Sequence, residues 1–399
     1  KLGGAFSWSI ARAVNSTGTV IVGQSSNLLG KSEAFVYQTG TMTGLGFLGT
    51  GDESAATGVS ADGTVIVGYS RITAGGAARH AFVYTNVMLD ETEWMSSLNG
   101  PGSLVAMTTN LNQLPLEGAH HRPLMSYDSM GKQSQAWATG DFGSSSRVRD
   151  VKVTSGEVGV NKDIAPNTLA GIAIGRGQQN QDLALDGSNN VIGNYVLGEI
   201  DYRPFGSQWI VSLLGMVGSW DAKINRGYSN GGSTDYSLGE TDITSRSARL
   251  RVDAPVLFSV GGFGFSPYAS YAVTQTVVEA YTEAGGALPA SYDQQEHNAT
   301  EARLGVMATK VFDEKLKLIV SLEGIHRFDG AGPALTGQDI TGSVGFSLPG
   351  QAPRPDCVRL GVDVDYKLAA DTLLNVSAHA STVGEVADVS GAVSIRRAF

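Results

Sequence analysis

Residues 358–367 read VRLGVDVDYK, in which apolar and charged side chains alternate along most of the segment. Because successive side chains of a strand point to opposite faces, this period of two predicts a β-strand. The apolar stripe consists of Val358, Leu360, Val362, Val364 and Tyr366, and the polar stripe contains Arg359, Asp363, Asp365 and Lys367. In a soluble sheet the charged stripe faces water, whereas in an outer-membrane barrel it faces a wet interior. One strand does not distinguish the two arrangements.

The same alternation recurs from about residue 134 to the end of the chain. Charged residues that interleave with apolar ones include Arg249, Arg251 and Arg303. We predict twelve strands, at residues 134–143, 154–165, 168–178, 191–203, 207–221, 240–254, 263–282, 293–311, 315–328, 356–369, 371–382 and 388–399. Most exceed the usual globular strand of about 5 or 6 residues and suit tilted membrane strands of about 9 to 11.

The connections between these strands differ in length. Those after even-numbered strands are mostly short, such as 166–167 and 313–314. Those after odd-numbered strands are often long and polar, such as 225–239 and 329–355, although 255–262 breaks the rule. Short turns at one rim and long loops at the other are typical of bacterial outer-membrane barrels.

The first 89 residues contain an internal repeat. GTVIVG occurs at 18–23 and again at 63–68, and EAFVY at 33–37 matches HAFVY at 80–84. Gly18 and Gly63 supply the glycine that a tight turn between two strands needs. A period of 40 to 50 residues suggests propeller-like blades or a β array. Two units are few for such an array, so we expect them to be the end of a longer one.

Between these regions, residues 90–130 have helix-like spacing in short pieces. Breaks are expected at Gly100-Pro101-Gly102, Pro115 and Pro123, because proline interrupts helices. We interpret the segment as a broken helical linker.

Composition narrows the class of protein. The 399 residues include 52 glycines, only 17% charged residues and a net charge of -10. These values suit a turn-rich all-β protein and argue against a nucleic-acid partner. A single cysteine allows no intramolecular disulfide, and no apolar run of about 18 residues predicts a spanning helix. No signal-peptide pattern opens the chain, so we expect that segment to have been removed or never present.

We expect no enzyme, metal or cofactor site. His120 and His121 are adjacent and would diverge on a helix, and His326 and His379 lack the partner spacing of a zinc site. No GxSxG nucleophile motif is present. Aspartates at 51–54 and 61–63 suit calcium or ordinary turns equally well.

Residues 110–399 resemble the C-terminal part of a classical autotransporter of the type V secretion family. LNQLPLEGAHH precedes the first strand, SQAWATGDFG opens it, and Phe399 ends the twelfth. The EAFVY and RHAFVY segments resemble extracellular HAF repeats. The resemblance implies a barrel-assembly signal at Gly391, Val393, Ile395 and Phe399. Arg397 departs from the pattern, since the family more often has a hydrophobic or aromatic residue there.

The resemblance implies a passenger fragment at 1–89, a helical linker at 90–130 that threads the lumen, and a twelve-stranded antiparallel transmembrane β-barrel at 131–399. The charged stripes would then face the lumen, and Val358 to Tyr366 would face lipid. The barrel would translocate, anchor and display an adhesive passenger at the surface of the bacterial outer membrane. In some autotransporters the linker cuts itself beside paired asparagines. Asn110 and Asn112 lie in the corresponding region but are not adjacent, so we do not expect self-cleavage.

Implied partners are outer-membrane lipid and lipopolysaccharide, the barrel-assembly machinery, periplasmic chaperones and an unknown extracellular ligand, with the chain itself a monomer. Two alternatives remain open. One is a porin-like channel with an N-terminal extension, which would keep its lumen open to solutes. The other is a soluble β protein that binds carbohydrate through its repeats and needs no detergent.

Overall fold

A computed structural model describes residues 8–38, 40–85, 91–127, 134–145, 151–204, 207–230, 233–340, 342, 344–350, 352, 354–382 and 388–399. The chain divides into two compact units, residues 1–94 with 229–234 and residues 95–228 with 235–399. Each unit is described by itself.

The N-terminal unit consists of two small antiparallel sheets, one for each repeat. The first contains β1 (Ser9–Val14), β2 (Ile21–Ser26), β3 (Ser32–Gln38) and β4 (Thr41–Gly44), and the second contains β5 (Ser54–Val59), β6 (Val65–Arg71) and β7 (Arg79–Thr85). Gly18 and Gly63 have φ of 75° and 81°, so the glycines predicted for the two turns adopt the left-handed conformation that glycine tolerates best. The sheets share a core of Val20, Val22, Ala34, Val36, Ala56 and Ile66.

The predicted broken linker is confirmed. It contains α1 (Glu91–Ser97), the 3-10 turn η1 (Pro101–Ser103), α2 (Leu104–Glu117) and the 3-10 turn η2 (Leu124–Tyr127). Gly100-Pro101-Gly102 separates the helices as expected, but the break expected at Pro115 is wrong. Pro115 lacks the N–H that would bond to the Leu111 carbonyl, but it lies in the last turn of α2, and the helix continues for only two more residues, to Glu117.

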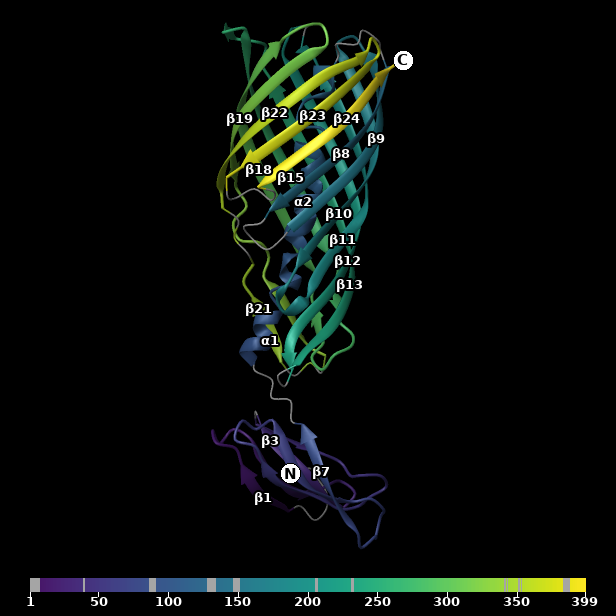
Figure 1. The fold of residues 1–399 in the computed structure, drawn as a ribbon, viewed down its shortest axis with the longest axis vertical. Helices are drawn as coiled ribbons and strands as arrows, with labels where there is room; N and C mark the ends of the chain where they lie inside the picture. The colour runs from purple at the N-terminus through teal and green to yellow at the C-terminus, as the bar shows by residue number, and fades with distance from the viewer. Residues whose placement is uncertain are drawn as a thin grey trace. The chain divides into compact units, whose positions relative to one another are not determined.

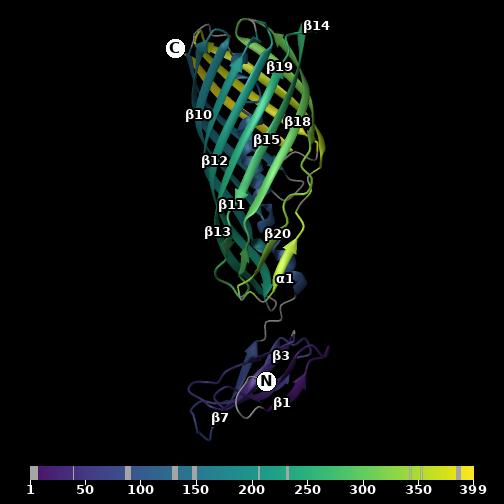
Figure 2. The same cartoon turned by 180° about the vertical axis from the view of Figure 1, so that it is seen from behind.

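Twelve long antiparallel strands form a closed barrel around α2, as predicted (Figures 1 and 2). They are β8 (Ser134–Ser145), β9 (Val151–Ala165), β10 (Thr168–Asp182), β11 (Ser188–Tyr202), β12 (Ile210–Asn230), β13 (Ser233–Asp253), β15 (Phe263–Val278), β18 (Gln295–Val311), β19 (Leu316–Arg327), β22 (Asp356–Ala369), β23 (Thr372–Ser381) and β24 (Val389–Ala398). The sheet closes where β24 pairs with β8 and where β13 pairs with β15. Closure leaves no free edge, which a bilayer requires of strands.

In the part of the chain that the structure describes, one 3-10 turn and five short strands lie in the connections between the long strands. They are η3 (Ala184–Asp186), β14 (Phe258–Val260), β16 (Tyr281–Thr282), β17 (Ala290–Tyr292), β20 (Leu335–Asp339) and β21 (Gly345–Leu348). The last four form a separate small sheet. Figures 1 and 2 show β20 and β21 at the end of the barrel opposite the C-terminus. No helix among the described residues is long and apolar enough to cross a bilayer.

The long polar loop predicted at 225–239 is wrong. β12 and β13 each run for 21 residues and extend through this segment. Their extension is stabilised by a contact that the local sequence does not reveal. Arg226 of β12 donates to Glu283 at 2.6 Å, and Leu238 of β13 bridges to Ala284. The long connections at this rim are therefore those that carry β16, β17, β20 and β21.

Candidate functional site: the helix-filled lumen

The two side-chain rows of strand β22 differ in chemical character. Val358, Leu360, Val362 and Tyr366 are exposed on the outside, and Val364 is half-buried in the same row. Arg359, Asp363 and Asp365 are buried on the inside, and Lys367 is half-buried at the end of that row. Arg249, Arg251 and Arg303 are also buried inside the barrel. The interior thus contains charges of both signs.

The inner wall is nevertheless not polar all round. Leu104, Met107, Leu111 and other apolar side chains of α2 pack in one cluster with wall residues. These wall residues include Trp137, Val153, Leu169, Tyr195, Leu197, Leu214, Met216 and Trp220. The helix is therefore held by apolar packing as well as by the charged stripes. Leucine and tryptophan on the inward rows of β8 to β12 give part of the lumen the character of a protein core.

Two arginines of the wall, on β13 and β22, cap the C-terminal end of α2. The last carbonyls of a helix lack partners within the helix and carry partial negative charge. Arg249 donates to the carbonyl oxygen of Leu116 and, at 2.6 Å, to that of His120. Arg359 donates to the carbonyl oxygen of Glu117 at 2.7 Å. Two wall arginines thus replace the water that would solvate an exposed helix end.

A network of ion pairs holds these arginines in place. Glu323 accepts from Arg303 and from Arg359, each at 3.1 Å, and from the Tyr268 hydroxyl at 3.0 Å. Arg251 pairs with Asp253 at 2.7 Å and stacks on the Tyr268 ring. Buried charges are tolerated when each is paired and hydrogen-bonded in this way.

His120 follows the helix and lies between two acidic residues of the wall. Its Nε2 is 2.8 Å from Glu157 of β9, and its Nδ1 is 2.7 Å from Glu199 of β11. Trp137 and Tyr195 also donate to Glu157, while the Leu124 N–H and Ser212 donate to Glu199. All three charged groups are buried. Both imidazole nitrogens are thereby engaged with carboxylates on one side of the barrel.

The next two residues contact the opposite wall. His121 Nε2 is 2.8 Å from Asp363 Oδ1, and Arg122 donates to Asp365 at 2.7 and 3.2 Å. Asp365 also pairs with Lys317 at 2.7 Å and accepts from Asn375 at 2.8 Å. The segment His120-His121-Arg122 therefore bridges the lumen, from β9 and β11 to β22.

Comparisons with known proteins identify the family to which this architecture belongs. Residues 131–379 match the family described as Autotransporter beta-domain. The chain belongs to this autotransporter family. It is therefore a type V secretion barrel of the bacterial outer membrane. Translocator barrels of this family are generally not enzymes. A search of curated protein sequences finds no match.

Solved structures support the fold. The translocator domain of autotransporter NalP from Neisseria meningitidis is 14% identical, with a TM-score of 0.55, and the match covers 78% of this chain and 98% of that chain. The beta domain of the Bordetella autotransporter Brka is 16% identical, with a TM-score of 0.45 and coverage of 67% and 99%. The transport unit of AIDA-I from Escherichia coli is 10% identical, with a TM-score of 0.39 and coverage of 74% and 99%. Of these three, only the NalP domain has a TM-score above 0.5, and at 14% identity it shows the fold alone.

In this autotransporter, Asn110 and Asn112 lie on α2 within the lumen. Asn110 is half-buried and Asn112 is fully buried. The Asn112 side-chain amide donates to the carbonyl oxygen of Thr108 at 2.7 Å and accepts from Ser245 at 2.8 Å. The amide nitrogen is thus engaged with the preceding helical turn.

The C-terminal strand of the autotransporter has its predicted signal residues on one row. Val393, Ile395 and Phe399 are exposed on the outer face, and Arg397 shares that face and pairs with Asp371 at 3.3 Å. Gly391 lies opposite Phe142 of β8, and a Cβ at Gly391 would be 2.6 Å from the Phe142 ring. An aromatic ring over a glycine of the neighbouring strand is a known way of fixing strand register.

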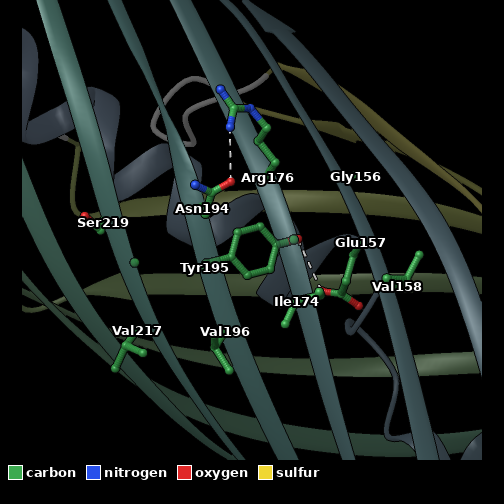
Figure 3. A pocket seen from close by; sticks show the side chains of 12 residues that line it. Gly156, Glu157, Val158, Ile174, Arg176, Asn194, Tyr195, Val196, Val217 and Ser219 are labelled. Atoms are coloured by element: carbon green, nitrogen blue, oxygen red, sulfur yellow. Dashed lines mark hydrogen bonds between the residues drawn. The ribbon is translucent and has the colours of Figure 1, made fainter.

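A recess of about 670 Å³ lies in the outer wall at β9 to β12 (Figure 3). Its lining includes the outward-facing side chains of Val158, Ile174, Val196 and Val217. Arg176 donates to Asn194 at 3.2 Å beside these apolar residues. The recess is therefore mainly apolar and has one cationic group.

Several residues of the lumen were missed by the sequence analysis. His120 and Arg122 were assigned to an unremarkable linker, and Glu157 was not singled out at all. A signal did exist, because Glu157, Glu199 and Asp201 occupy the inward row of predicted strands. What the sequence lacked was the distance information that matches a linker cation to a particular strand.

Proposed function

We propose that this autotransporter exports the repeat unit as a passenger and then keeps it attached through a linker that remains locked in the barrel. The passenger fragment would be residues 1–89, the linker 90–130 and the barrel 131–399. The repeats retain their resemblance to extracellular HAF repeats, and we assign them an adhesive role toward an extracellular ligand.

The observation that carries this proposal is the bridge formed by His120 and Arg122. His120 engages Glu157 and Glu199 on one wall, and Arg122 engages Asp365 on the other. Removing one partner of a buried ion pair typically costs about 3–5 kcal/mol, because the other charge is left unpaired. Withdrawal of the linker would expose several such groups at once. The linker therefore acts as a retained plug.

The porin-like alternative is disfavoured by the same contacts. A diffusion channel needs an open, water-filled lumen. Here α2 fills it with Leu104, Met107 and Leu111 packed against the wall. A soluble carbohydrate-binding protein is disfavoured by the outward row from Val358 to Tyr366, which has no protein partner to cover it.

We further propose that the passenger is not released by self-cleavage. Cleavage by cyclisation of an asparagine needs its side-chain nitrogen free to attack the residue's own main-chain carbonyl carbon, which breaks the following peptide bond and releases the amine of the next residue. The Asn112 nitrogen instead donates to Thr108. The chain would then stay one piece, with no catalytic residue.

The outer face would contact lipid through Val358, Leu360, Val362, Val364 and Tyr366. The recess in Figure 3 has room for an acyl chain, and Arg176 beside it suits the phosphate of an outer-membrane lipid or lipopolysaccharide. During biogenesis we assign Gly391, Val393, Ile395 and Phe399 to recognition by the barrel-assembly machinery, after delivery by periplasmic chaperones. The final barrel would be a monomer.

The plug is tested by conductance in planar bilayers, using the intact chain and a variant that lacks residues 1–130. We expect low conductance from the intact chain and a large, steady conductance from the variant, because deletion empties the lumen. A matched variant lacking only residues 1–85 retains the linker and should stay closed. A large conductance from the intact chain would instead favour the porin.

Display is tested separately in whole cells. An epitope tag placed before β1 should be accessible to antibody and external protease without lysis, and the chain should run at full length on a denaturing gel. A tag that becomes accessible only after lysis would exclude surface display. A shortened, membrane-bound fragment that disappears when Asn112 is replaced by Asp would show self-cleavage.

A further inference from the structure

Three side chains of metal-binding type meet inside the barrel, beside the bridge described above. They are His121 of the linker, Asp363 of β22 and His379 of β23, and their ligand atoms all lie within 4.8 Å of one another. Their exposed fractions are 8%, 1% and 5%. The three come from separate parts of the chain, so no sequence spacing could predict the cluster.

Four polar atoms of this cluster lack a hydrogen bond among the described residues. His121 Nε2 lies 2.8 Å from Asp363 Oδ1, but the pair does not have the alignment of a hydrogen bond. Asp363 Oδ2 and His379 Nδ1 are also buried and have no hydrogen-bond partner among the described residues. Most buried polar atoms in proteins do have such a partner. These atoms belong to three side chains that meet in one buried cluster, an arrangement that a bound cation would satisfy.

The orientation of His121 suits a metal ligand. Its Nδ1 is 2.5 Å from the carbonyl oxygen of Gly118. A proton on Nδ1 satisfies that carbonyl and leaves Nε2, 2.8 Å from Asp363 Oδ1, with a lone pair that can bind a cation. Metal-bound histidines almost always donate their other ring nitrogen to a carbonyl or carboxylate in this way. The His121 and His379 rings pack edge to face with centroids 5.1 Å apart, which brings both imidazoles to the same site.

The wall is shaped to admit the second imidazole. Gly361 lies opposite His379 in the pairing of β22 with β23, and a Cβ at Gly361 would be 2.5 Å from the His379 ring. Ser377 lies opposite Asp363, and its buried hydroxyl also lacks a partner among the described residues. Ser377 is therefore placed to supply a further oxygen ligand or to hold a bound water.

We propose that His121, Asp363 and His379 bind one Zn²⁺ ion that fastens the linker to the barrel wall. Two imidazole nitrogens and one carboxylate oxygen form a common zinc donor set, and the Ser377 hydroxyl or water completes four-coordination. Arg122 Nε forms a long ion pair with Asp363 at 3.9 Å, but the hydrogen bonds of this guanidinium go to Asp365, and both Asp363 oxygens remain without a hydrogen bond among the described residues. The inference uses the plugged lumen of the proposed function but does not depend on export.

The first experiment measures zinc in the full chain folded in detergent. The protein is treated with chelator, supplied with ZnCl₂, desalted, and analysed for metal by mass spectrometry. We expect about one zinc per chain in the wild type and less than about a tenth of that in His379→Gln and Asp363→Asn. The matched control is His326→Gln. His326 also faces an aspartate, Asp356 at 2.7 Å, but is half exposed at a strand end and should leave the zinc content unchanged.

Unboiled gel mobility establishes that each variant has folded before its metal is counted. A wild type that retains no zinc, or a folded His379→Gln variant that retains as much as the wild type, would overturn the proposal. If His379→Gln does not fold, wild-type protein loaded with Co²⁺ decides, because four-coordinate cobalt has intense visible bands and six-coordinate cobalt in solvent does not. Zinc binding with a failed display assay would reject the proposed function alone.

Discussion

Single residues of the N-terminal unit can be tested outside the membrane. In the turn of the second repeat, the Ser60 hydroxyl donates to the Asp62 carboxylate and the Thr64 N–H donates to it at 3.1 Å. These hydrogen bonds favour the charged form and lower the pKa of Asp62 to about 2. A depressed folded-state pKa contributes stability above the unfolded pKa, near ~3.9, and that contribution is lost as the pH falls toward 2.

We therefore expect Ser60→Ala to raise the pKa of Asp62 toward ~3.9, because the largest single contribution to the shift is removed. Carboxyl chemical shifts followed by NMR between about pH 1.5 and 6, which brackets the ordinary pKa of an aspartate, measure the pKa of Asp62. The matched control is Ser32→Ala in the first repeat, which leaves the turn intact. An unchanged Asp62 pKa in Ser60→Ala would contradict the assignment.

Within the lumen, the decisive residue is His120. Replacing it by Gln leaves Glu157 and Glu199 buried without their cation, and we expect a loss of about 3–5 kcal/mol in the free energy of unfolding. Urea unfolding followed by tryptophan fluorescence measures this loss. His326→Gln, which breaks an exposed pair with Asp356, should change stability by less than about 0.5 kcal/mol. Equal effects of the two substitutions would refute the bridge.

At the scale of elements, the strand extensions of β12 and β13 depend on one buried ion pair. Arg226 donates to Glu283 and to the carbonyl oxygen of Leu288, and also to Ser97 of α1 at 2.8 Å. Arg226 and Glu283 are almost fully buried. One guanidinium thus ties the extension, the β16–β17 loop and the start of the linker together.

We expect Arg226→Met to open the β16–β17 loop, because Glu283 loses its partner and has to be solvated. External protease should then cut between residues 279 and 294 at least about tenfold faster, which corresponds to about 1.4 kcal/mol of local stability. Lys223→Met, which removes an exposed pair with Glu240 at 3.4 Å, serves as the control and should not change the rate. Resistance of Arg226→Met to protease would show that other contacts hold the loop.

At the scale of the whole molecule, barrel closure joins the two ends of the barrel sequence. β24 pairs with β8 from Val389 to Ala398, and the Phe399 N–H donates to the Ser134 carbonyl at 3.0 Å. The last residue therefore completes the ladder and also presents its ring on the outside. Closure and the proposed assembly signal reside in the same strand.

We expect Phe399→Ala to reduce the amount of heat-modifiable barrel in outer membranes several-fold, while barrel that does assemble remains as stable as the wild type. Boiled and unboiled gels of membrane fractions measure both quantities. Phe312→Ala removes another exposed aromatic, near the β18–β19 turn, and should leave assembly unchanged. A Phe399→Ala barrel that assembles normally would remove the signal from Phe399.

The sequence by itself determined the barrel, its twelve strands, and the two turns at Gly18 and Gly63. These features depend on alternation and on glycine, which are local properties of the chain. Only the tertiary structure decided that part of the lumen is apolar, that 225–230 and 233–239 are strand, and that His120, His121 and Arg122 each meet a particular wall residue. Those outcomes depend on which strands face each other across the lumen. Strand periodicity states that a side chain points inward, but not what it meets there.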